Sequence, residues 1–297
     1  MMLTGRYEIG LEAFKKVLEI SPERTYTAPN IAHWSTVYGR YEEAMRWMIP
    51  LQDNDSNLPR ATAALAQIYK NLGMSDKFRE SMSRAQELSP EDTNLFDLAA
   101  DFYFQAGDHA GLNDIAATEF EKIDPSASAR YSPTNRTRYF WHGLVVLLEG
   151  NYVQAASDMT EAAGGEEGID AATYDEITRL KYSAYVYQKQ GQVGAANALL
   201  SKCLTLAIDA QDQGWDTPTI HYRTAQIYSL QGDLDNAIKE LQQAVDRGWL
   251  IAGLLEQDPL WAPMQEDVRF QAIAQQVNEA LTIERDKVTA LLALNDH

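Results

Sequence analysis

The chain has little of what a disulfide-stabilised or membrane-spanning protein needs. Cys203 is the one cysteine among 297 residues, so no disulfide can form within the chain. This fits a reducing compartment, and we expect the cytoplasm. No run approaches the ~20 consecutive apolar residues of a membrane helix, and residues 1–6 lack the apolar core of a signal peptide. We therefore expect no membrane contact.

Basic residues are also scarce. The chain has 25 Lys and Arg against 43 Asp and Glu, a formal net charge of −18. Nucleic-acid binding needs a basic surface to displace counterions, so we expect no nucleic-acid partner for this region. Two interpretations of the acidic charge stay open: it keeps a long protein soluble, or it complements a basic partner.

The side chains of metal and catalytic sites are few and scattered. The five histidines, none in zinc-site spacing, are His33, His109, His142, His221 and His297. The glycine-rich stretch 164–168 has no following lysine or hydroxyl residue to hold phosphate. Cys203 falls at a position that is small in other repeat units, which favours packing over reactivity. The sequence therefore predicts no metal, no cofactor and no enzyme.

Glycine, by contrast, recurs at fixed intervals. Gly5, Gly39, Gly73 and Gly107 are each 34 residues apart, and Gly150, Gly191 and Gly232 follow after 43, 41 and 41 residues. Small residues stand seven positions before the six later glycines: Ala32, Ala66, Ala100, Gly143, Ala184 and Ala225. Small residues also recur five positions after most of the glycines: Gly10, Ala44, Ala155, Ala196 and Ala237. This pattern predicts pairs of closely packed amphipathic helices that turn at each glycine.

The turns resemble those of the tetratricopeptide repeat family. The resemblance lies in the stretches Gly39-Arg-Tyr-Glu-Glu-Ala44 and Gly232-Asp-Leu-Asp-Asn-Ala237, and in the Leu-Ser-Pro-Glu boundary at 88–91. It implies an all-α fold, a right-handed α-solenoid of antiparallel helical hairpins. We expect about six full repeats, an N-terminal half-repeat and a C-terminal capping helix. A globular α-bundle with accidental periodicity is the alternative.

The change of period divides the predicted solenoid into parts. We expect N-terminal repeats over 1–124 with the 34-residue period, a connection or hinge over 125–135, and C-terminal repeats over 136–247 with a period of about 41 residues. A capping segment, 248–297, should end in a long helix that covers the last unit. The first unit lacks its first helix, so it is either an unusual cap or part of a longer protein.

The capping segment also resembles the C-terminal end of tetratricopeptide regions in bacterial winged-helix regulators and class III nucleotide cyclases. The resemblance lies in Gly248-Trp249, Asp258-Pro259-Leu260, Ala262-Pro263, Asp267 and Arg269-Phe270. Val268 departs from the proline usual there. The resemblance implies a regulatory or sensory region of a larger bacterial signalling or transcription-regulating protein.

The first helix of each hairpin is expected to line a concave, partner-binding groove. Projection of the inward positions onto the chain gives Gln67, Lys70, Asn71, Asp101, Phe104, Gln105, Phe140, Leu144, Leu147, Leu148, Lys181, Tyr185, Gln188, Lys189, Tyr222 and Gln226. The alternative for the apolar central residues is that they pack against neighbouring helices. Three functions follow: a non-catalytic protein-protein interaction scaffold that binds a peptide or protein, a small-molecule sensor, or a self-assembly module that pairs through its first helix.

Overall fold

We describe a computed structural model of the chain that covers residues 6–21, 27–54, 59–124, 126, 130–170 and 176–295. Every regular element in these ranges is a helix, which confirms the predicted all-α class. The elements are α1 (Tyr7–Ile20), α2 (Thr27–Val37), α3 (Tyr41–Asn54), α4 (Pro59–Asn71), α5 (Ser75–Leu88), α6 (Thr93–Gln105), α7 (His109–Phe120), α8 (Pro133–Leu148), α9 (Tyr152–Ala163), α10 (Gly165–Asp170), α11 (Ile177–Lys189), α12 (Val193–Asp212), α13 (Pro218–Gln231), α14 (Leu234–Asp246), α15 (Ala252–Gln257), η3 (Pro259–Met264) and α16 (Val268–Asn295).

The periodic glycines end the first helix of each hairpin, as predicted. The six that the structure describes all have left-handed backbone, with φ between 66° and 82°. The amide after each glycine donates to the carbonyl five residues back, as from Arg40 to Ser35 and from Asp233 to Tyr228. This bond satisfies a helix-end carbonyl that would otherwise lack a partner. The shared geometry explains why a single residue type recurs at this corner.

The small residues lie where the two helices of a hairpin cross. Ala32, Ala66, Ala184 and Ala225 in the first helices are fully buried, as are Ala44, Ala155, Ala196 and Ala237 in the second helices. At Gly143 an added Cβ would come within 3.0 Å of Asp158 Cβ. Close backbone approach therefore selects small side chains here, as the sequence predicted.

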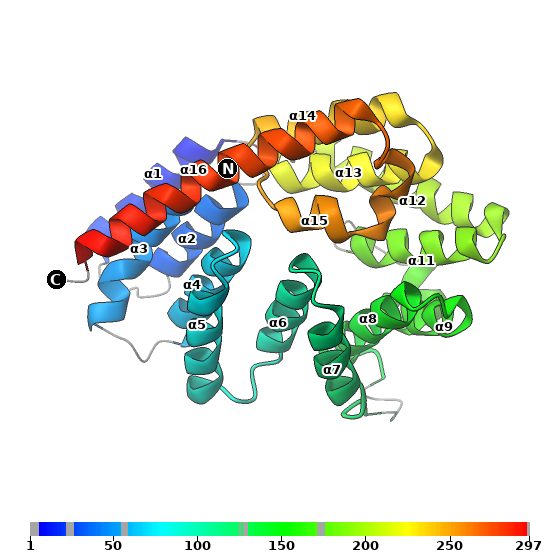
Figure 1. Cartoon of the computed structure of the whole chain (residues 1–297), viewed down its shortest axis with the longest axis horizontal. Helices are drawn as coiled ribbons and strands as arrows, with labels where there is room; N and C mark the ends of the chain where they lie inside the picture. Colours follow the sequence, from blue (N-terminus) through cyan, green and yellow to red (C-terminus); the bar gives the residue numbers. More distant parts are fainter. Residues whose placement is uncertain are drawn as a thin grey trace.

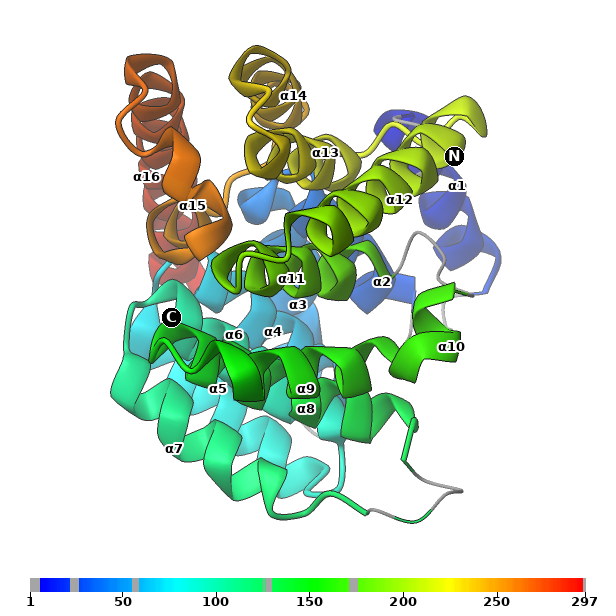
Figure 2. The same cartoon turned by 90° about the vertical axis from the view of Figure 1, so that its right-hand side faces the viewer.

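The hairpins curve so far that the C-terminal segment returns to the first repeats (Figure 1). Helix α16 lies along α14 and then along α3, while α15 packs on α6. Figure 2 shows the same arrangement from the side, with α15 and α16 beside α6, α13 and α14. The capping helix thus does more than cover the last unit, because it closes the solenoid into a ring.

The closure depends on close backbone contacts between the second repeat and the segment after α14. The hydroxyl of Tyr41 donates to the carbonyl of Leu250 at 3.0 Å. A Cβ on Gly39 would lie 2.3 Å from the Gly248 carbonyl oxygen, and a Cβ on Gly248 would lie 2.1 Å from the Tyr38 carbonyl oxygen. Both glycines are therefore required for the two backbones to meet.

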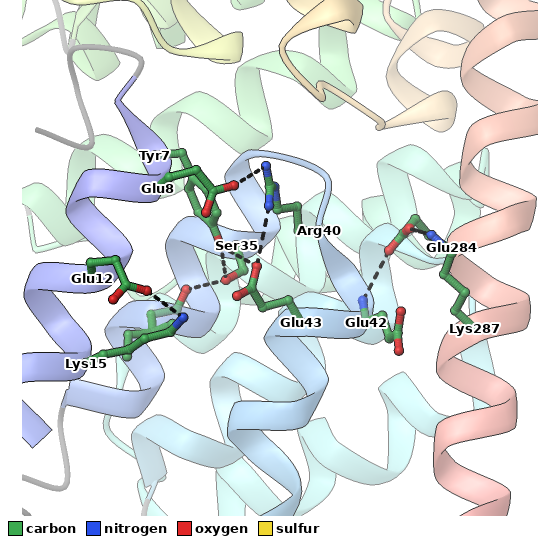
Figure 3. Close-up of polar contacts among 11 residues, drawn as sticks. Tyr7, Glu8, Glu12, Lys15, Ser35, Arg40, Glu42, Glu43, Glu284 and Lys287 are labelled. Carbon is green, nitrogen blue, oxygen red and sulfur yellow. Dashed lines mark hydrogen bonds and ion pairs between the residues drawn. The ribbon is translucent and has the colours of Figure 1, made fainter. Parts of the chain in front are cut away.

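Helix α16 also supplies polar groups to helix ends of the N-terminal repeats. The Glu284 carboxylate accepts a hydrogen bond of 3.2 Å from the Glu42 amide in the first turn of α3 (Figure 3). Arg285 Nε donates to the Leu72 carbonyl, just after α4, at 2.6 Å. An anion at a helix start and a cation at a helix end both interact favourably with the helix dipole. These contacts fix the position of α16 along the repeats.

Two large hydrophobic cores of the described residues form the body of the ring, and a third, smaller cluster around Tyr7 and Leu11 lies at α1 and α2. One joins α2 to α6 with α13 to α16, including Met48, Leu72 and Trp261. The other joins α6 to α13, including Leu144, Met159 and Leu200. Helices α6 and α13 contribute side chains to both cores. The first and last repeats therefore share one core, although they are far apart in sequence.

The N-terminal half-repeat packs on α2 and α3. Tyr7 of α1 points between α2 and α3, where its hydroxyl lies 2.7 Å from Ser35 Oγ and 2.9 Å from Glu43 Oε2 (Figure 3). Burial raises the pKa of the Tyr7 phenol above its ordinary value. Arg40 covers the Tyr7 ring and forms an ion pair of 2.7 Å with Glu8.

Two further expectations can be compared with the structure, one on the connection 125–135 and one on the length of apolar runs. Of the predicted connection 125–135, residues 126 and 130–135 are described, and α8 already begins at Pro133; the remainder lies outside the described residues. Helix α12 is long and apolar enough to span a membrane, contrary to the expectation that no run approaches this length. It packs between α11 and α13, and Leu200 and Cys203 are fully buried.

Candidate functional site

The inner side of the ring contains a cavity of about 730 Å³. Its walls come from the first helices of successive hairpins, α2, α4, α6, α8, α11 and α13, and from the segment 249–258. The volume lies in the range of small-molecule sites. Aromatic side chains make up much of the wall: Phe104, Phe140, Trp141, Tyr182, Tyr222 and Trp249. Closure of the ring therefore converts an open groove into a bounded chamber.

A buried polar network forms one wall of this chamber. The amide oxygen of Gln226 accepts a hydrogen bond from Lys181 Nζ, and the amide nitrogen donates to Asp258 Oδ2 at 2.7 Å and to Tyr222 Oη at 3.0 Å. The other Asp258 oxygen accepts from the Leu260 amide at 3.0 Å. Trp261 Nε1 donates to Tyr222 Oη at 3.3 Å. The network connects α11 and α13 to residues 248–270, the closing segment of the ring.

Burial shifts the protonation of this network. Lys181 is only 2% exposed and Asp258 only 5%. Loss of hydration lowers the pKa of the Lys181 amine to about 7 and raises the pKa of the Asp258 carboxyl. It also raises the pKa of the Tyr222 phenol well above its ordinary value. The wall therefore carries less charge than its residue types suggest.

A second polar cluster lies on α4 and α6. Lys70 forms an ion pair with Asp101, and Gln105 Nε2 donates to the same carboxylate oxygen at 2.9 Å. Trp141 Nε1 donates to Asp97 Oδ1 at 2.7 Å, and burial raises the pKa of the Asp97 carboxyl. His33 of α2 also lines the chamber, and loss of hydration lowers the pKa of its imidazole. The carboxyl groups of α6 thus face the chamber, and Arg60 of α4 adds a cation to its lining.

Half of the predicted groove residues lie on the chamber wall. Eight do so: Gln67, Asp101, Phe104, Phe140, Leu144, Lys181, Tyr222 and Gln226. Three more lie behind the wall and contact residues that line it. Lys70 and Gln105 both bind the Asp101 carboxylate, and Asn71 accepts a hydrogen bond from Gln67. Leu147 and Tyr185 belong to the hydrophobic core. Their role in binding a partner stays a prediction.

The remaining predicted residues lie away from the chamber. Leu148 lines a separate cleft of about 300 Å³ with His109 and Leu112. Gln188 donates to the Leu230 carbonyl at 2.8 Å, and Lys189 lies 5.0 Å from the centre of the Tyr185 ring. The positions nearest each glycine thus lie at the end of the hairpin, where they contact the neighbouring repeat.

Several chamber residues escaped the repeat-based projection. Trp249, Ile251, Leu254 and Asp258 come from the closing segment, which belongs to no repeat. The distinctive composition of this segment was visible in the sequence, but its position across the ring was not. Trp141 directly follows the projected residue Phe140, and Tyr182 directly follows the projected residue Lys181. Their periodic positions could have been found by widening the projected stripe by one residue.

The chamber has no arrangement suited to metal binding. Within the ranges that the structure describes, no group of three His, Cys, Asp or Glu side chains could hold a metal ion. Cys203 is free and buried, and burial raises the pKa of its thiol to about 12. A thiol with so high a pKa is a poor nucleophile. The chamber is suited to binding through its aromatic walls and buried polar groups.

The comparisons with known proteins concern the repeats and the fold. Residues 59–92 and 218–247, which comprise α4–α5 and α13–α14, match the tetratricopeptide repeat model. No curated protein sequence matches the chain. A chain in the crystal structure of the APC/C hetero-tetramer Cut9–Hcn1 is similar over 93% of this chain, with a TM-score of 0.56 and 14% identity. The match covers 47% of that chain, so this chain spans about half its length.

A second solved structure has similar dimensions. A tetratricopeptide repeat protein from Parabacteroides merdae is similar over 92% of this chain and 93% of its own, with a TM-score of 0.52 and 14% identity. At such identity the likeness concerns the fold. It agrees with the left-handed glycine corners and the buried small residues of the hairpins. Two of its helical hairpins match the tetratricopeptide repeat model, and the chain folds as an all-α solenoid like those of tetratricopeptide repeat proteins.

Proposed function

We propose that this protein is a non-catalytic protein-protein interaction scaffold, and that its ring chamber binds a short segment of a partner protein. The observation that carries the proposal is the chamber itself, which six first helices and the closing segment line with aromatic side chains. Concave surfaces of this origin are the ones through which helical solenoids bind. Aromatic side chains supply large contact areas at low entropic cost.

The chamber limits what a partner can insert. A volume of about 730 Å³ has room for a few side chains of an extended segment and none for a folded domain. Charged groups of both signs line it, among them Arg60, Asp97 and Asp101. We therefore propose a partner segment with an apolar residue at the centre and polar residues at its ends. A basic residue facing Asp97 and Asp101 is consistent with the acidic charge of the whole chain.

We also propose that the protein is the regulatory or sensory region of a larger bacterial signalling or transcription-regulating protein, located in the cytoplasm. The support is the composition of the closing segment, from Gly248-Trp249 to Arg269-Phe270. In the structure these residues close the ring and complete the chamber. A ligand in the chamber would contact the closing segment, which joins both ends of the solenoid. A sensory region needs this coupling between binding and the arrangement of its ends.

A small-molecule sensor is the second candidate. The observation that favours it is that the ring bounds the chamber, whose volume falls within the range of metabolite sites. A ligand that contacts both the repeats and Trp249 or Leu254 would stabilise the closed ring. Self-association through α1 remains a third proposal. Its exposed residues include Ile9 and Ile20, and light scattering at high concentration tests it.

The experiment is selection of a peptide display library against the full chain, followed by anisotropy measurements with the selected peptides. Phe140 lines the chamber and is partly buried, so Phe140→Ala should weaken peptide binding at least about ten-fold. Val153→Ala, at an exposed site on α9 outside the chamber, is the matched control and should leave binding unchanged.

A thermal-shift screen of metabolites on the same protein separates the two candidates. Selected peptides that bind in a Phe140-dependent way support the scaffold. Stabilisation by a metabolite, with no peptide selected, supports the sensor and rejects peptide binding in the chamber. Peptides that bind equally well to Phe140→Ala and wild type would place the interaction elsewhere.

A further inference from the structure

Lys181 on α11 is an unusual lysine. It is one of the largest fully buried side chains among the described residues, yet it lies on the wall of the chamber. Its amine donates to a neutral acceptor, the amide oxygen of Gln226. No carboxylate in the described part of the chain forms an ion pair with it. A buried ammonium without an adjacent anion is costly, and the usual response is loss of the proton.

Lys70 shows the contrasting case in the same ring. It is also buried, at 5% exposure, but it forms an ion pair with Asp101. The Asp101 carboxylate offsets part of the cost of removing the Lys70 amine from water. Lys239 on α14 is exposed and represents an ordinary lysine. The protein thus contains a buried unpaired, a buried paired and an exposed lysine for comparison.

The charged groups around Lys181 affect the pKa of its amine less than burial does. Asp258, beyond the Gln226 amide, favours the ammonium, while Arg223 on α13 opposes it. Cys203 on α12, Tyr222 on α13 and Tyr182 on α11 are neutral near pH 7, because burial raises the pKa of each. Burial remains the largest influence and lowers the pKa of the Lys181 amine to about 7. The free amine is therefore accessible at neutral pH, where an ordinary lysine is almost entirely charged.

We propose that Lys181 is a nucleophilic amine of the ring chamber that binds carbonyl compounds reversibly as an imine. The nitrogen lone pair attacks the carbonyl carbon and forms the C–N bond. The carbonyl oxygen then leaves as water, taking both amine protons with it. No oxidant or reductant is consumed, and addition of water reverses the reaction. Desolvated lysines in apolar sites are activated for this chemistry.

The chamber walls indicate which carbonyl compounds fit. Phe140, Trp141 and Leu144 form an apolar wall from α8, and Trp249 adds an indole from the closing segment. The ligand class is therefore an aldehyde or ketone with a compact apolar or aromatic body. This inference goes beyond the proposed scaffold function, since it requires no partner protein. Peptide binding and lysine labelling are measured separately, so either can fail alone.

The test treats the full chain with benzaldehyde and sodium cyanoborohydride, which delivers hydride to the imine carbon and fixes the adduct as a benzylamine. Peptide mapping by mass spectrometry then gives the labelling rate at each lysine. At pH 7 we expect Lys181 to react at least about ten-fold faster than Lys70 or Lys239. The ratio of the rate at Lys181 to the rate at Lys239 should fall as the pH rises from 7 to 10, because the pH dependence of hydride delivery is common to both sites and cancels in the ratio.

The outcomes separate clearly. Faster labelling at Lys181 at pH 7, with an advantage over Lys239 that shrinks by pH 10, supports the proposal, and Lys181→Met should then remove that labelled peptide alone. Labelling of Lys181 no faster than that of Lys239 at pH 7, or an advantage that does not change with pH, overturns it. The decisive measurement uses the wild-type protein, so a folding defect in the variant does not affect the conclusion.

Discussion

Lys181 and Lys70 differ in the group that each amine meets. Lys70 faces the Asp101 carboxylate across α4 and α6, and Lys181 faces the Gln226 amide across α11 and α13. Both side chains are buried, so burial alone does not decide their charge. The neighbour decides it, because a carboxylate offsets the lost hydration of an ammonium and an amide does so only in part.

Lys181→Met removes an amine that is costly to bury, but it also leaves the buried Gln226 amide oxygen without its donor, which costs about 1–3 kcal/mol. The stability of the variant relative to wild type should fall between pH 7 and pH 9. Lys181 has a pKa of about 7 in the folded protein and an ordinary, higher pKa when unfolded. Between these values the unfolded state binds more protons, so Lys181 makes wild-type stability rise with pH.

Urea unfolding of both proteins at pH 7 and pH 9 measures this difference, and contributions from other groups cancel in the comparison. A stability difference between the two proteins that does not change between pH 7 and pH 9 would contradict the assignment.

At this scale the sequence predicted the repeating residues better than the binding residues. The glycine corners and small crossing residues follow from local geometry, which repeats in every hairpin. The groove positions do not repeat so strictly. Leu147, for example, was projected inward but is buried in the core, because the orientation of α8 depends on its neighbours. Trp249 and Asp258 lie outside the repeats, so the repeat pattern could not predict that they line the chamber.

Helix α16 is an element whose sequence suggests a simple cap but whose contacts are more specific. Its apolar face includes Phe270, Ile273, Val277, Leu281 and Val288, all buried as the pattern predicted. Its polar residues Glu284 and Arg285 meet a helix start and a helix end on α3 and α4. The periodicity revealed the apolar face, and only the fold shows which surface that face covers.

Arg285→Met should destabilise the protein by about 1.5–3 kcal/mol, because the Leu72 carbonyl loses a charged hydrogen-bond donor at the end of α4. The matched control is Lys239→Met, which removes an exposed cation from α14 and should change the free energy of unfolding by less than about 0.5 kcal/mol. Guanidinium unfolding monitored by circular dichroism measures both. Equal effects of the two substitutions would show that Arg285 does not help to hold α16.

The whole molecule is a closed ring with two shared cores. Contacts such as Tyr41 to Leu250 and Leu72 to Arg285 join residues more than 200 positions apart. Repeat periodicity specifies how neighbouring hairpins stack, and small rotations per repeat then add up to the curvature. The closure could not be read from the sequence, because it depends on the sum of these rotations.

Gly248→Ala should open the ring. The new methyl group would lie 2.1 Å from the Tyr38 carbonyl oxygen, and the φ of 98° adds strain. Gly150→Ala is the matched control, since Gly150 has a φ of 82° but open space around its Cβ position. It should cost about 1 kcal/mol.

Hydrogen exchange measured by mass spectrometry distinguishes the two variants. Gly248→Ala should speed exchange in both α3 and α16 and leave α8 and α9 unchanged, because only the former pair shares the ring-closing core. Exchange that rises in α16 alone would mean that the ends do not stabilise each other.

The ring also affects when the protein can fold. In an open solenoid each hairpin can pack as soon as the next one leaves the ribosome, and synthesis adds only about 5–20 residues per second. Here the core of the second and third hairpins includes Trp261, Phe270 and Leu281. These residues are synthesised long after α3 and α4, so the apolar surfaces of those two helices stay uncovered until then. The N-terminal repeats are therefore the part of the nascent chain with the greatest need of a chaperone.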